Sequence, residues 1–455
     1  MNNRHFKTAI AVLLLAALLL CCTSCFSPIS FVVVGNAVKK LDSASSYTVF
    51  SSLSLSIPDS KGKTVTVSEE GRTEYYGLDS EDFTYFSELK TTVEKNGKRS
   101  TSGRMEAFEK GTHYLETTEG TMPSTRLCAS LSKEEFLSYL NEDAALGASD
   151  VAIESLCSST RYKMTKNGAA VVYSNFNAEG LAKFSALTRG IEDLFASGTV
   201  LADIRITLTA NLTGEAEKLE MEFLYEGENE ETLPTLTVEN RYDLINETQP
   251  YVYTGHDGKF KECDDVRALR QVDNLLSSRR FAEEGEFSFS QIASARSGAL
   301  SEREVATGNV SYGHDQGGLY FSSFEQEKGQ QITKTYKNGE KTTVTKKDGT
   351  VLQDRTVKSN ASTEKTLIQN KMVPFFLEGQ HVKDVEKTKE GWRITFKKAV
   401  YALYGSGSSN GLEDAYLAVT VEDDEITKFY YYQEFSIKSA GRTINSTFSY
   451  SVTFE

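Results

Sequence analysis

The sequence of 455 residues contains one tryptophan, six prolines, six methionines and five histidines. Histidine is the commonest protein ligand of metals and a frequent general base, so its scarcity leaves few candidates for either role. Basic residues are also in deficit, with 50 Lys and Arg against 64 Asp and Glu, which gives a net charge of -14. Nucleic-acid binding draws much of its affinity from neutralised phosphates, so this balance argues against a nucleic-acid partner.

Long hydrophobic runs are missing too. The longest, Thr8–Leu20, has 13 residues and follows the basic residues Arg4 and Lys7. A membrane-spanning helix needs about 20 apolar residues, whereas the hydrophobic region of a secretory signal peptide has about 7–15. The pattern therefore predicts an export signal. An uncleaved anchor that extends through Phe31–Val34 is the alternative.

Directly after this run comes Cys21-Cys22-Thr23-Ser24-Cys25. It resembles the lipobox of bacterial lipoproteins, in which a small residue precedes a cysteine that is acylated. The resemblance implies that residues 1–24 are removed and that Cys25 carries the lipid, with Cys22 as the alternative. We therefore expect a lipoprotein of the cell envelope, bearing palmitate-like chains and held on the extracytoplasmic side of the cell membrane.

Few cysteines remain after residue 25. Cys128 and Cys157 enclose a loop of about 30 residues, and a disulfide between them would contribute about 3–4 kcal/mol in an export compartment. Two buried free thiols are the alternative. Cys263 has no partner in either case. With no histidine near these cysteines at ligand spacing, the sequence predicts neither a zinc site nor any other cofactor.

The chain repeats one pattern of apolar residues. Residues 33–41 have helical apolar spacing, and a strand follows in which alternate residues are large and apolar. A second helix and strand follow about 230 residues later, with one constant offset of 234 residues. The matched positions are Tyr47 and Phe281, Leu53 and Phe287, and Leu55 and Phe289.

Shorter features recur in the same order. Asn96-Gly97 and Asn338-Gly339 each lie between alternating segments, where Asn-Gly is typical of a β-hairpin. Ser132 and Glu135 have the spacing of a capping box, and a further helix is predicted at 181–194. We predict a tether at 25–32, a first module at 33–250, a linker at 251–262 and a second module at 263–455.

Each module is expected to be α+β, with a curved antiparallel sheet, or half-barrel, and helices packed on one face. This order of elements behind a lipidated N-terminus resembles the LolA/LolB and LppX/LprG superfamily, here as a tandem duplicate. The resemblance implies a hydrophobic or amphiphilic, lipid-like ligand between sheet and helices. Candidate residues for the ligand groove are Tyr47, Leu53, Leu55, Phe287 and Phe289. In the alternative, the cores are closed and the modules bind an envelope protein partner.

Motifs of catalysis are weak. Gly407–Gly411 fits the G-x-S-x-G pattern, but no histidine follows Ser409 to complete a triad. The acidic runs 228–231 and 422–425 are typical of solvated hairpin tips. We therefore expect no enzyme. Five lysines crowd one predicted hairpin, either as a solvated face or as a contact with anionic headgroups: Lys334, Lys337, Lys341, Lys346 and Lys347.

Overall fold

The computed structural model describes most of the chain after residue 28. The described residues are 29–58, 64–121, 123–143, 153–185, 199–227, 233–251, 259–298, 300–315, 318–328, 330–347, 350–375, 377–401, 410–439 and 442–455. The predicted signal peptide, the lipid-attachment residue Cys25, the acidic run 228–231 and most of the loop 405–411 lie outside them. None of the described helices is long and apolar enough to cross a membrane.

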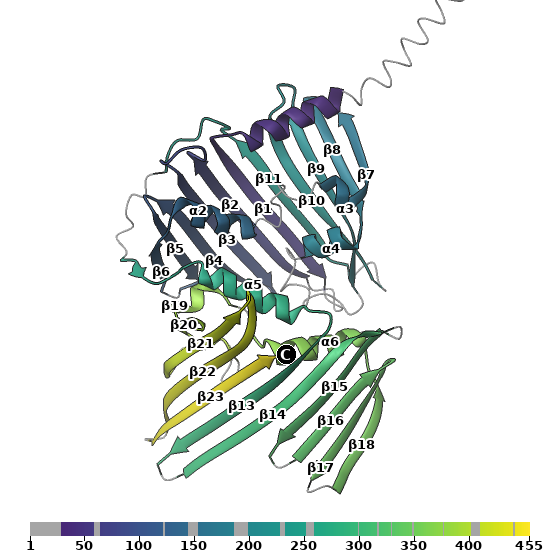
Figure 1. Cartoon of the computed structure of the whole chain (residues 1–455), viewed down its shortest axis with the longest axis vertical. Helices are drawn as coiled ribbons and strands as arrows, with labels where there is room; N and C mark the ends of the chain where they lie inside the picture. Colours follow the sequence, from purple (N-terminus) through teal and green to yellow (C-terminus); the bar gives the residue numbers. More distant parts are fainter. Residues whose placement is uncertain are drawn as a thin grey trace, which may run out of the picture. The chain divides into compact units, whose positions relative to one another are not determined.

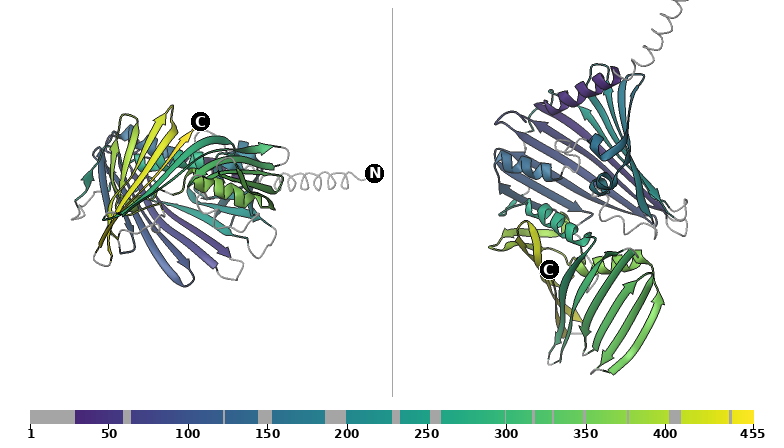
Figure 2. Two further views of the ribbon diagram at one scale, coloured as in Figure 1. Left: turned by 90° about the horizontal axis from the view of Figure 1, so that it is seen from below. Right: turned by 45° about the vertical axis from the view of Figure 1, so that its right-hand side comes forward.

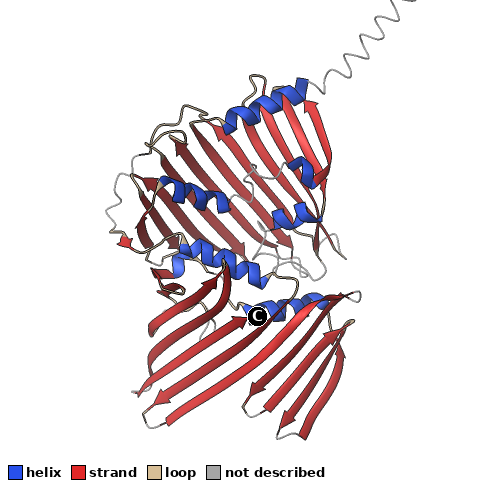
Figure 3. Ribbon diagram, viewed as in Figure 1, coloured by secondary structure: helices blue, strands red, loops and turns tan. Residues whose placement is uncertain are grey.

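The described part of the chain is mostly β, with 63% of its residues in strands and 16% in helices, so the predicted α+β class is wrong (Figure 3). Within the described residues, the helices do not form a layer on a half-barrel: each has 14 residues or fewer and lies against only part of a sheet. Sequence reasoning undercounts strands such as β17 (Glu340–Lys347), since its polar and charged residues show almost no apolar alternation.

The first sheet has twelve strands in the order β12-β6-β5-β4-β3-β2-β1-β11-β10-β9-β8-β7 (Figure 1). All pairs whose register is given are antiparallel except β12 with β6, which is parallel. The strands are β1 (Ser46–Pro58), β2 (Thr64–Tyr76), β3 (Thr84–Lys95), β4 (Lys98–Glu109), β5 (Thr112–Glu119), β6 (Thr125–Ser130), β7 (Cys157–Met164), β8 (Gly168–Phe176), β9 (Val200–Asn211), β10 (Ala216–Glu226), β11 (Thr235–Asp243) and β12 (Lys261–Glu262).

The second sheet has eleven antiparallel strands in the order β18-β17-β16-β15-β14-β13-β23-β22-β21-β20-β19. Besides β17, its strands are β13 (Gly285–Ser297), β14 (Leu300–Asp315), β15 (Gly318–Glu327), β16 (Gln330–Lys337), β18 (Thr350–Lys358), β19 (Val382–Lys387), β20 (Gly391–Phe396), β21 (Leu412–Glu422), β22 (Glu425–Ser439) and β23 (Arg442–Phe454). Strands in both sheets twist, as expected for long strands of L-residues (Figure 2).

Helices precede the sheets or connect their strands. They are the helix 29–42, α2 (Lys133–Asp143), α3 (Ile153–Leu156), α4 (Ala178–Ser185), α5 (Ala268–Arg280), α6 (Ala361–Met372) and the short 3₁₀ helix η4 (Gly379–His381). The predicted capping box is present at α2, because the Ser132 hydroxyl accepts the Glu135 N–H at 3.1 Å and the Glu135 carboxylate accepts the Ser132 N–H at 2.8 Å. Of the predicted helix 181–194, residues 181–185 are in α4 and the rest lie outside the described residues.

The two sheets share one topology. In each sheet, six strands that are consecutive in the chain lie side by side, β1–β6 in the first and β13–β18 in the second. The first of them also pairs with a much later strand, β1 with β11 and β13 with β23, and the two-residue β12 is added at the β6 edge of the first sheet. The register follows the sequence repeat: Leu55 faces Leu236 in the first sheet, and Phe289 faces Val452 in the second. The third matched pair differs, since Tyr47 lies in β1 but Phe281 is the C-cap of α5.

The hairpin turns repeat as well. Asn96 and Gly97 have φ of 55° and 72°, and Asn338 and Gly339 have φ of 55° and 77°. Two successive residues with positive φ form the turn that suits the twist of a two-residue hairpin. These turns connect β3 to β4 and β16 to β17, as the Asn-Gly pairs predicted.

The two compact units of the structure do not coincide with the two halves of the sequence repeat. One unit contains residues 1–111 and 132–254, and the other contains residues 112–131 and 255–455. The hairpin β5–β6 therefore belongs to the second unit, although it precedes that unit by more than a hundred residues. Its apolar residues Leu115, Leu127 and Ala129 join the same buried cluster as Phe287, Phe321 and Phe429.

Candidate ligand-binding site

A cavity of about 120 Å³ lies in the second unit between α6 and the strands β14–β17. Its position follows from the alternation of side chains in the strands, which places residues two apart on the face toward α6. The lining residues are Val310, Phe321, Ser323, Glu325, Lys334, Lys341, Glu364, Leu367, Ile368 and Lys371.

Apolar residues form one part of the lining. Val310, Phe321 and Ile368 are buried and belong to the core of the second unit. Leu367, on the same helix as Ile368, is 50% exposed. An exposed leucine beside a buried apolar surface gives the opening of the cavity an apolar edge.

Charged residues form the other part. The carboxylate of Glu325 accepts hydrogen bonds from Lys334 at 3.2 Å and from Lys371 at 2.5 Å. Glu364, whose side chain is 3% exposed, accepts from Lys341 through both carboxylate oxygens at 2.8 and 3.0 Å. Buried carboxylates are tolerated when paired in this way. Among the lining residues, three lysines against two glutamates leave one surplus positive charge.

The electrostatics of the Glu325 pair reflect this crowding. Burial acts to raise the pKa of Glu325, but the hydrogen bond and charge of Lys371, together with Lys334, outweigh it and lower that pKa below its ordinary value. Burial lowers the pKa of Lys371, although Glu325 opposes the shift. The ammonium group of Lys371 also lies 4.7 Å from the centre of the Phe289 ring.

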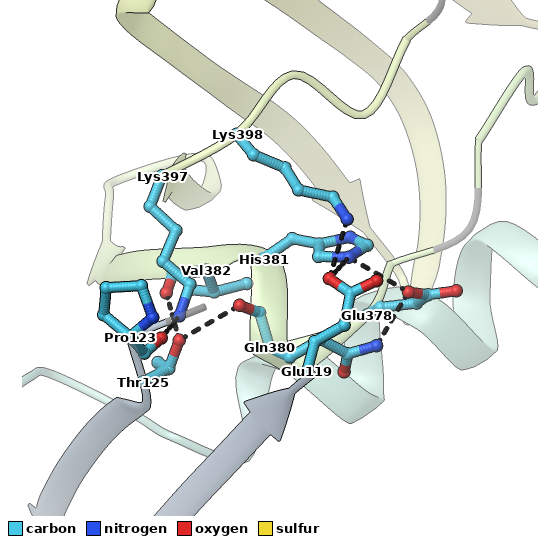
Figure 4. Close-up of polar contacts among 9 residues, drawn as sticks. All are labelled: Glu119, Pro123, Thr125, Glu378, Gln380, His381, Val382, Lys397 and Lys398. Atoms are coloured by element: carbon cyan, nitrogen blue, oxygen red, sulfur yellow. Dashed lines mark hydrogen bonds and ion pairs between the residues drawn. The ribbon is translucent and has the colours of Figure 1, made fainter. Parts of the chain in front are cut away.

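A second polar cluster in the same unit joins the β5–β6 hairpin to η4 and the segment after β20 (Figure 4). The Nε2 atom of His381 is 2.9 Å from Glu119 and 3.3 Å from Glu378, and Lys398 is 2.7 Å from Glu119. Burial and the charge of Lys398 lower the pKa of His381, despite the opposing effect of Glu119. The Thr125 hydroxyl on the hairpin donates to the Val382 carbonyl at 2.7 Å.

In the first unit, a buried charge group lies against α2. Arg104 on β4 is 3.0 Å from Glu106, and Tyr139 of α2 donates to Glu106 at 2.7 Å. A helix that follows the sixth strand thus contacts a glutamate in both units: the buried Glu106 in the first and the partly buried Glu325 in the second. The contact differs between the units: Tyr139 donates to Glu106 on the fourth strand, β4, whereas Lys371 contacts Glu325 on the third strand, β15.

The residues predicted for a ligand groove lie elsewhere. Leu55, Phe287 and Phe289 are buried in the two cores and do not line the cavity. Leu53 is partly buried against the core of the first unit. The ring of Tyr47 packs at a tilt against that of Tyr75 with the ring centres 4.7 Å apart, and burial raises the pKa of Tyr47.

The cysteines at 128 and 157 are both free thiols, so the predicted disulfide between them is not formed in this structure. The neighbour of Cys128 is Cys263, whose N–H donates to the Cys128 carbonyl at 3.0 Å. Burial raises the pKa of Cys263 to about 12 and also raises that of Cys128.

The lysines of the predicted lysine-rich hairpin lie in different surroundings. Lys334 and Lys341 line the cavity, whereas Lys337 pairs with Asp315 at 2.9 Å and is 63% exposed. Sequence reasoning identified the lysines but missed their carboxylate partners Glu325 and Glu364. An alternation in β15 of Phe321, Ser323 and Glu325 on one face is the feature that would have placed a carboxylate among core residues.

Comparison with known proteins gives no family. No protein-family model matches the chain, so the resemblance to the LolA/LolB and LppX/LprG superfamily gains no support from one, and no curated protein matches. A solved structure of a DUF1329 family protein from Desulfovibrio piger has 11% identity, covers 41% of this chain and 93% of its own, and has a TM-score of 0.16. Transferrin Binding Protein B from Haemophilus parasuis has 5% identity, covers 90% and 76%, and has a TM-score of 0.15. At these TM-scores neither likeness establishes a common fold.

Proposed function

We propose that this protein is a lipid-anchored, extracytoplasmic binding protein without catalytic activity, and that it holds an amphiphilic ligand between sheet and helix in its second unit. The observation that carries the proposal is the cavity under α6. It combines an apolar part at Val310, Phe321 and Ile368 with a charged part at Glu325 and its two lysines. The export pattern Thr8–Leu20 and the lipobox-like Cys25 support the location.

The size of the cavity limits what fits inside it. Pockets for drug-sized ligands have about 300–1,000 Å³, and an engineered cavity of about 150 Å³ holds one benzene molecule. A cavity of about 120 Å³ therefore takes a small molecule or one end of a longer one. A whole lipid does not fit within this volume.

Native mass spectrometry tests the proposal. The chain from residue 26 is produced without its lipid, measured directly, and measured again after solvent extraction and addition of short amphiphiles. We expect one bound small molecule per chain. A clean mass with no uptake of any added amphiphile would contradict the binding role.

A pair of variants locates the binding. Leu367→Trp adds bulk at the apolar edge of the cavity and should reduce uptake, because Leu367 lines the cavity but is half exposed. Leu300→Trp is the control, since Leu300 is 70% exposed and is not among the lining residues. Equal uptake by both variants would place the ligand elsewhere.

The alternative function is an envelope interaction module. It is favoured by the burial of Leu55, Phe287 and Phe289, which shows that these strand faces are filled by core packing. Affinity capture with the tagged mature chain tests this alternative. A stoichiometric protein partner together with an empty cavity would replace the ligand-binding proposal.

A further inference from the structure

We propose that the ligand of the α6 cavity is a small monocarboxylate, with its carboxylate beside Lys334 and Lys371 and its apolar body against Val310, Phe321 and Ile368. This inference rests on the proposed function and specifies its ligand class. Three properties of the cavity support it: the charge balance, the hydrogen-bonding capacity and the volume.

The charge balance favours a single negative charge. Three lysines and two glutamates line the cavity, and the side chains of Lys334 and Lys371 are only 30% and 28% exposed. A charge that is partly removed from water is stabilised by an opposite charge nearby. One carboxylate neutralises the surplus, an alcohol leaves it, and an amine increases it.

The free N–H donors of Lys334 and Lys371 place the carboxylate of the ligand next to Glu325. Both Lys334 and Lys371 donate to the same oxygen of Glu325, Oε1. Each ammonium group has three N–H donors, so one bond to Glu325 leaves capacity for a second acceptor. Lys341 differs, because it donates to both oxygens of Glu364. The site thus already holds one carboxylate between two lysines and has donors for another.

The volume limits the apolar body. A cavity of about 120 Å³ is slightly smaller than the one of about 150 Å³ that accepts benzene, so about six non-hydrogen atoms of the ligand lie inside it, and the rest of a longer chain extends through the opening beside Leu367. A phosphate monoester carries about 1.5 to 2 negative charges at neutral pH, which exceeds the single surplus positive charge. The carboxylate is therefore favoured over a phosphate.

The test compares four probes with the same six-carbon chain: hexanoate, hexan-1-ol, hexylamine and hexyl phosphate. Binding to the mature chain is measured by calorimetry and ligand-observed NMR at neutral pH. We expect hexanoate to bind about tenfold or more tightly than hexan-1-ol, because of its charged hydrogen bonds, and hexylamine to bind least.

Variants identify the lysines. Lys371→Met and Lys334→Met keep the aliphatic stem and remove the charge, so each should weaken hexanoate about tenfold and leave hexan-1-ol nearly unchanged. Lys337→Met is the control on the same hairpin, because Lys337 is exposed and pairs with Asp315. Circular dichroism of each variant is the control for folding.

The outcomes separate the two proposals. Equal binding of hexanoate and hexan-1-ol, or tighter binding of hexyl phosphate, would overturn the carboxylate assignment and leave a ligand site in place. Loss of hexanoate binding in Lys337→Met as large as in Lys371→Met would also overturn it. If no probe binds and native mass spectrometry shows no bound molecule, both this inference and the proposed function fail.

Discussion

Replacement of Asp273 by asparagine should stabilise the second unit at neutral pH. Asp273 lies on α5, where its carboxylate accepts the N–H of Leu377 at 3.1 Å. Burial raises the pKa of Asp273 to about 6 from an ordinary value of 3.8, although the Leu377 hydrogen bond acts in the opposite direction. The fold thus disfavours the charged form of this carboxyl group.

The size and sign of the effect follow from proton binding. One pKa unit corresponds to about 1.36 kcal/mol, so a shift of about two units costs the folded protein about 3 kcal/mol when Asp273 is charged. Between the two pKa values the unfolded chain binds fewer protons than the folded one, and stability therefore falls as pH rises from about 4 to about 6. Below pH 3.8 the penalty is absent, and above pH 6 it is complete.

The assay uses the single tryptophan of the chain. Trp392 lies on β20 in the second unit, so urea unfolding followed by its fluorescence reports the stability of that unit. Asp273→Asn keeps an oxygen that accepts the Leu377 N–H. We expect it to be more stable than the wild type by up to about 3 kcal/mol at pH 7, with the difference disappearing near pH 4.

A matched control separates burial from hydrogen bonding. Asp264 accepts the N–H of Lys387 at 2.9 Å but is exposed, so Asp264→Asn should change stability by less than about 1 kcal/mol. The reasoning is refuted if Asp273→Asn is no more stable than the wild type at pH 7, or if its advantage is the same at pH 4.

Three further outcomes are expected. Ser132→Ala should destabilise the first unit by about 1 kcal/mol, because it removes one of the two hydrogen bonds of the capping box of α2. Chemical unfolding followed by circular dichroism measures this, and an unchanged stability would show that the cap is not needed. Tyr431→Phe should lower the free energy of unfolding by about 1–3 kcal/mol, because the buried Tyr431 hydroxyl accepts hydrogen bonds from two backbone N–H groups. Tyr432→Phe should lower it less, because that side chain is partly exposed, and a larger loss in Tyr432→Phe would contradict this reasoning. Lys398→Met should raise the pKa of His381, because the positive charge of Lys398 lowers that pKa. An NMR titration of the His381 imidazole measures the change, and a lower pKa in the variant would contradict the assigned contacts.

The strands and their repetition follow from local sequence. Alternation at Leu53, Leu55, Phe287 and Phe289 places these residues on the inward face of β1 and β13, because successive side chains of a strand point to opposite faces. Asn-Gly pairs predicted two hairpins for an equally local reason. Such features need only a few neighbouring residues, so a single sequence contains them.

The fold class and the site depend on contacts between distant residues. Helical spacing at 33–41 and 181–194 suggested a helical layer. The share of helix is nevertheless small, because many strands, such as β17, are too polar for apolar periodicity to reveal. Glu325 and Lys371 are 46 positions apart in the chain, and their pairing requires β15 and α6 to pack together. No local pattern reports such a pair.

The sequence pattern also did not predict to which unit the hairpin β5–β6 belongs. Residues 112–131 continue the strand order of the first sheet, and periodicity assigns them to the first module. Their apolar side chains nevertheless pack with residues of the second unit. A fragment that begins at residue 255 would therefore lack part of its own core.

The pairing of each first strand with its last strand has a consequence during synthesis. When β1 leaves the ribosome, its partner β11 is still about 190 residues away, which is about 10–40 seconds at ordinary rates of translation. The β11 side of β1 stays without its backbone partners for that time, and open strand edges are sites of aggregation. A shorter delay of about 8–30 seconds recurs between β13 and β23, whose starts lie about 157 residues apart. In the second sheet β23 lies between β13 and β22, so a chain that ended before residue 442 would leave the facing edges of both strands without a partner.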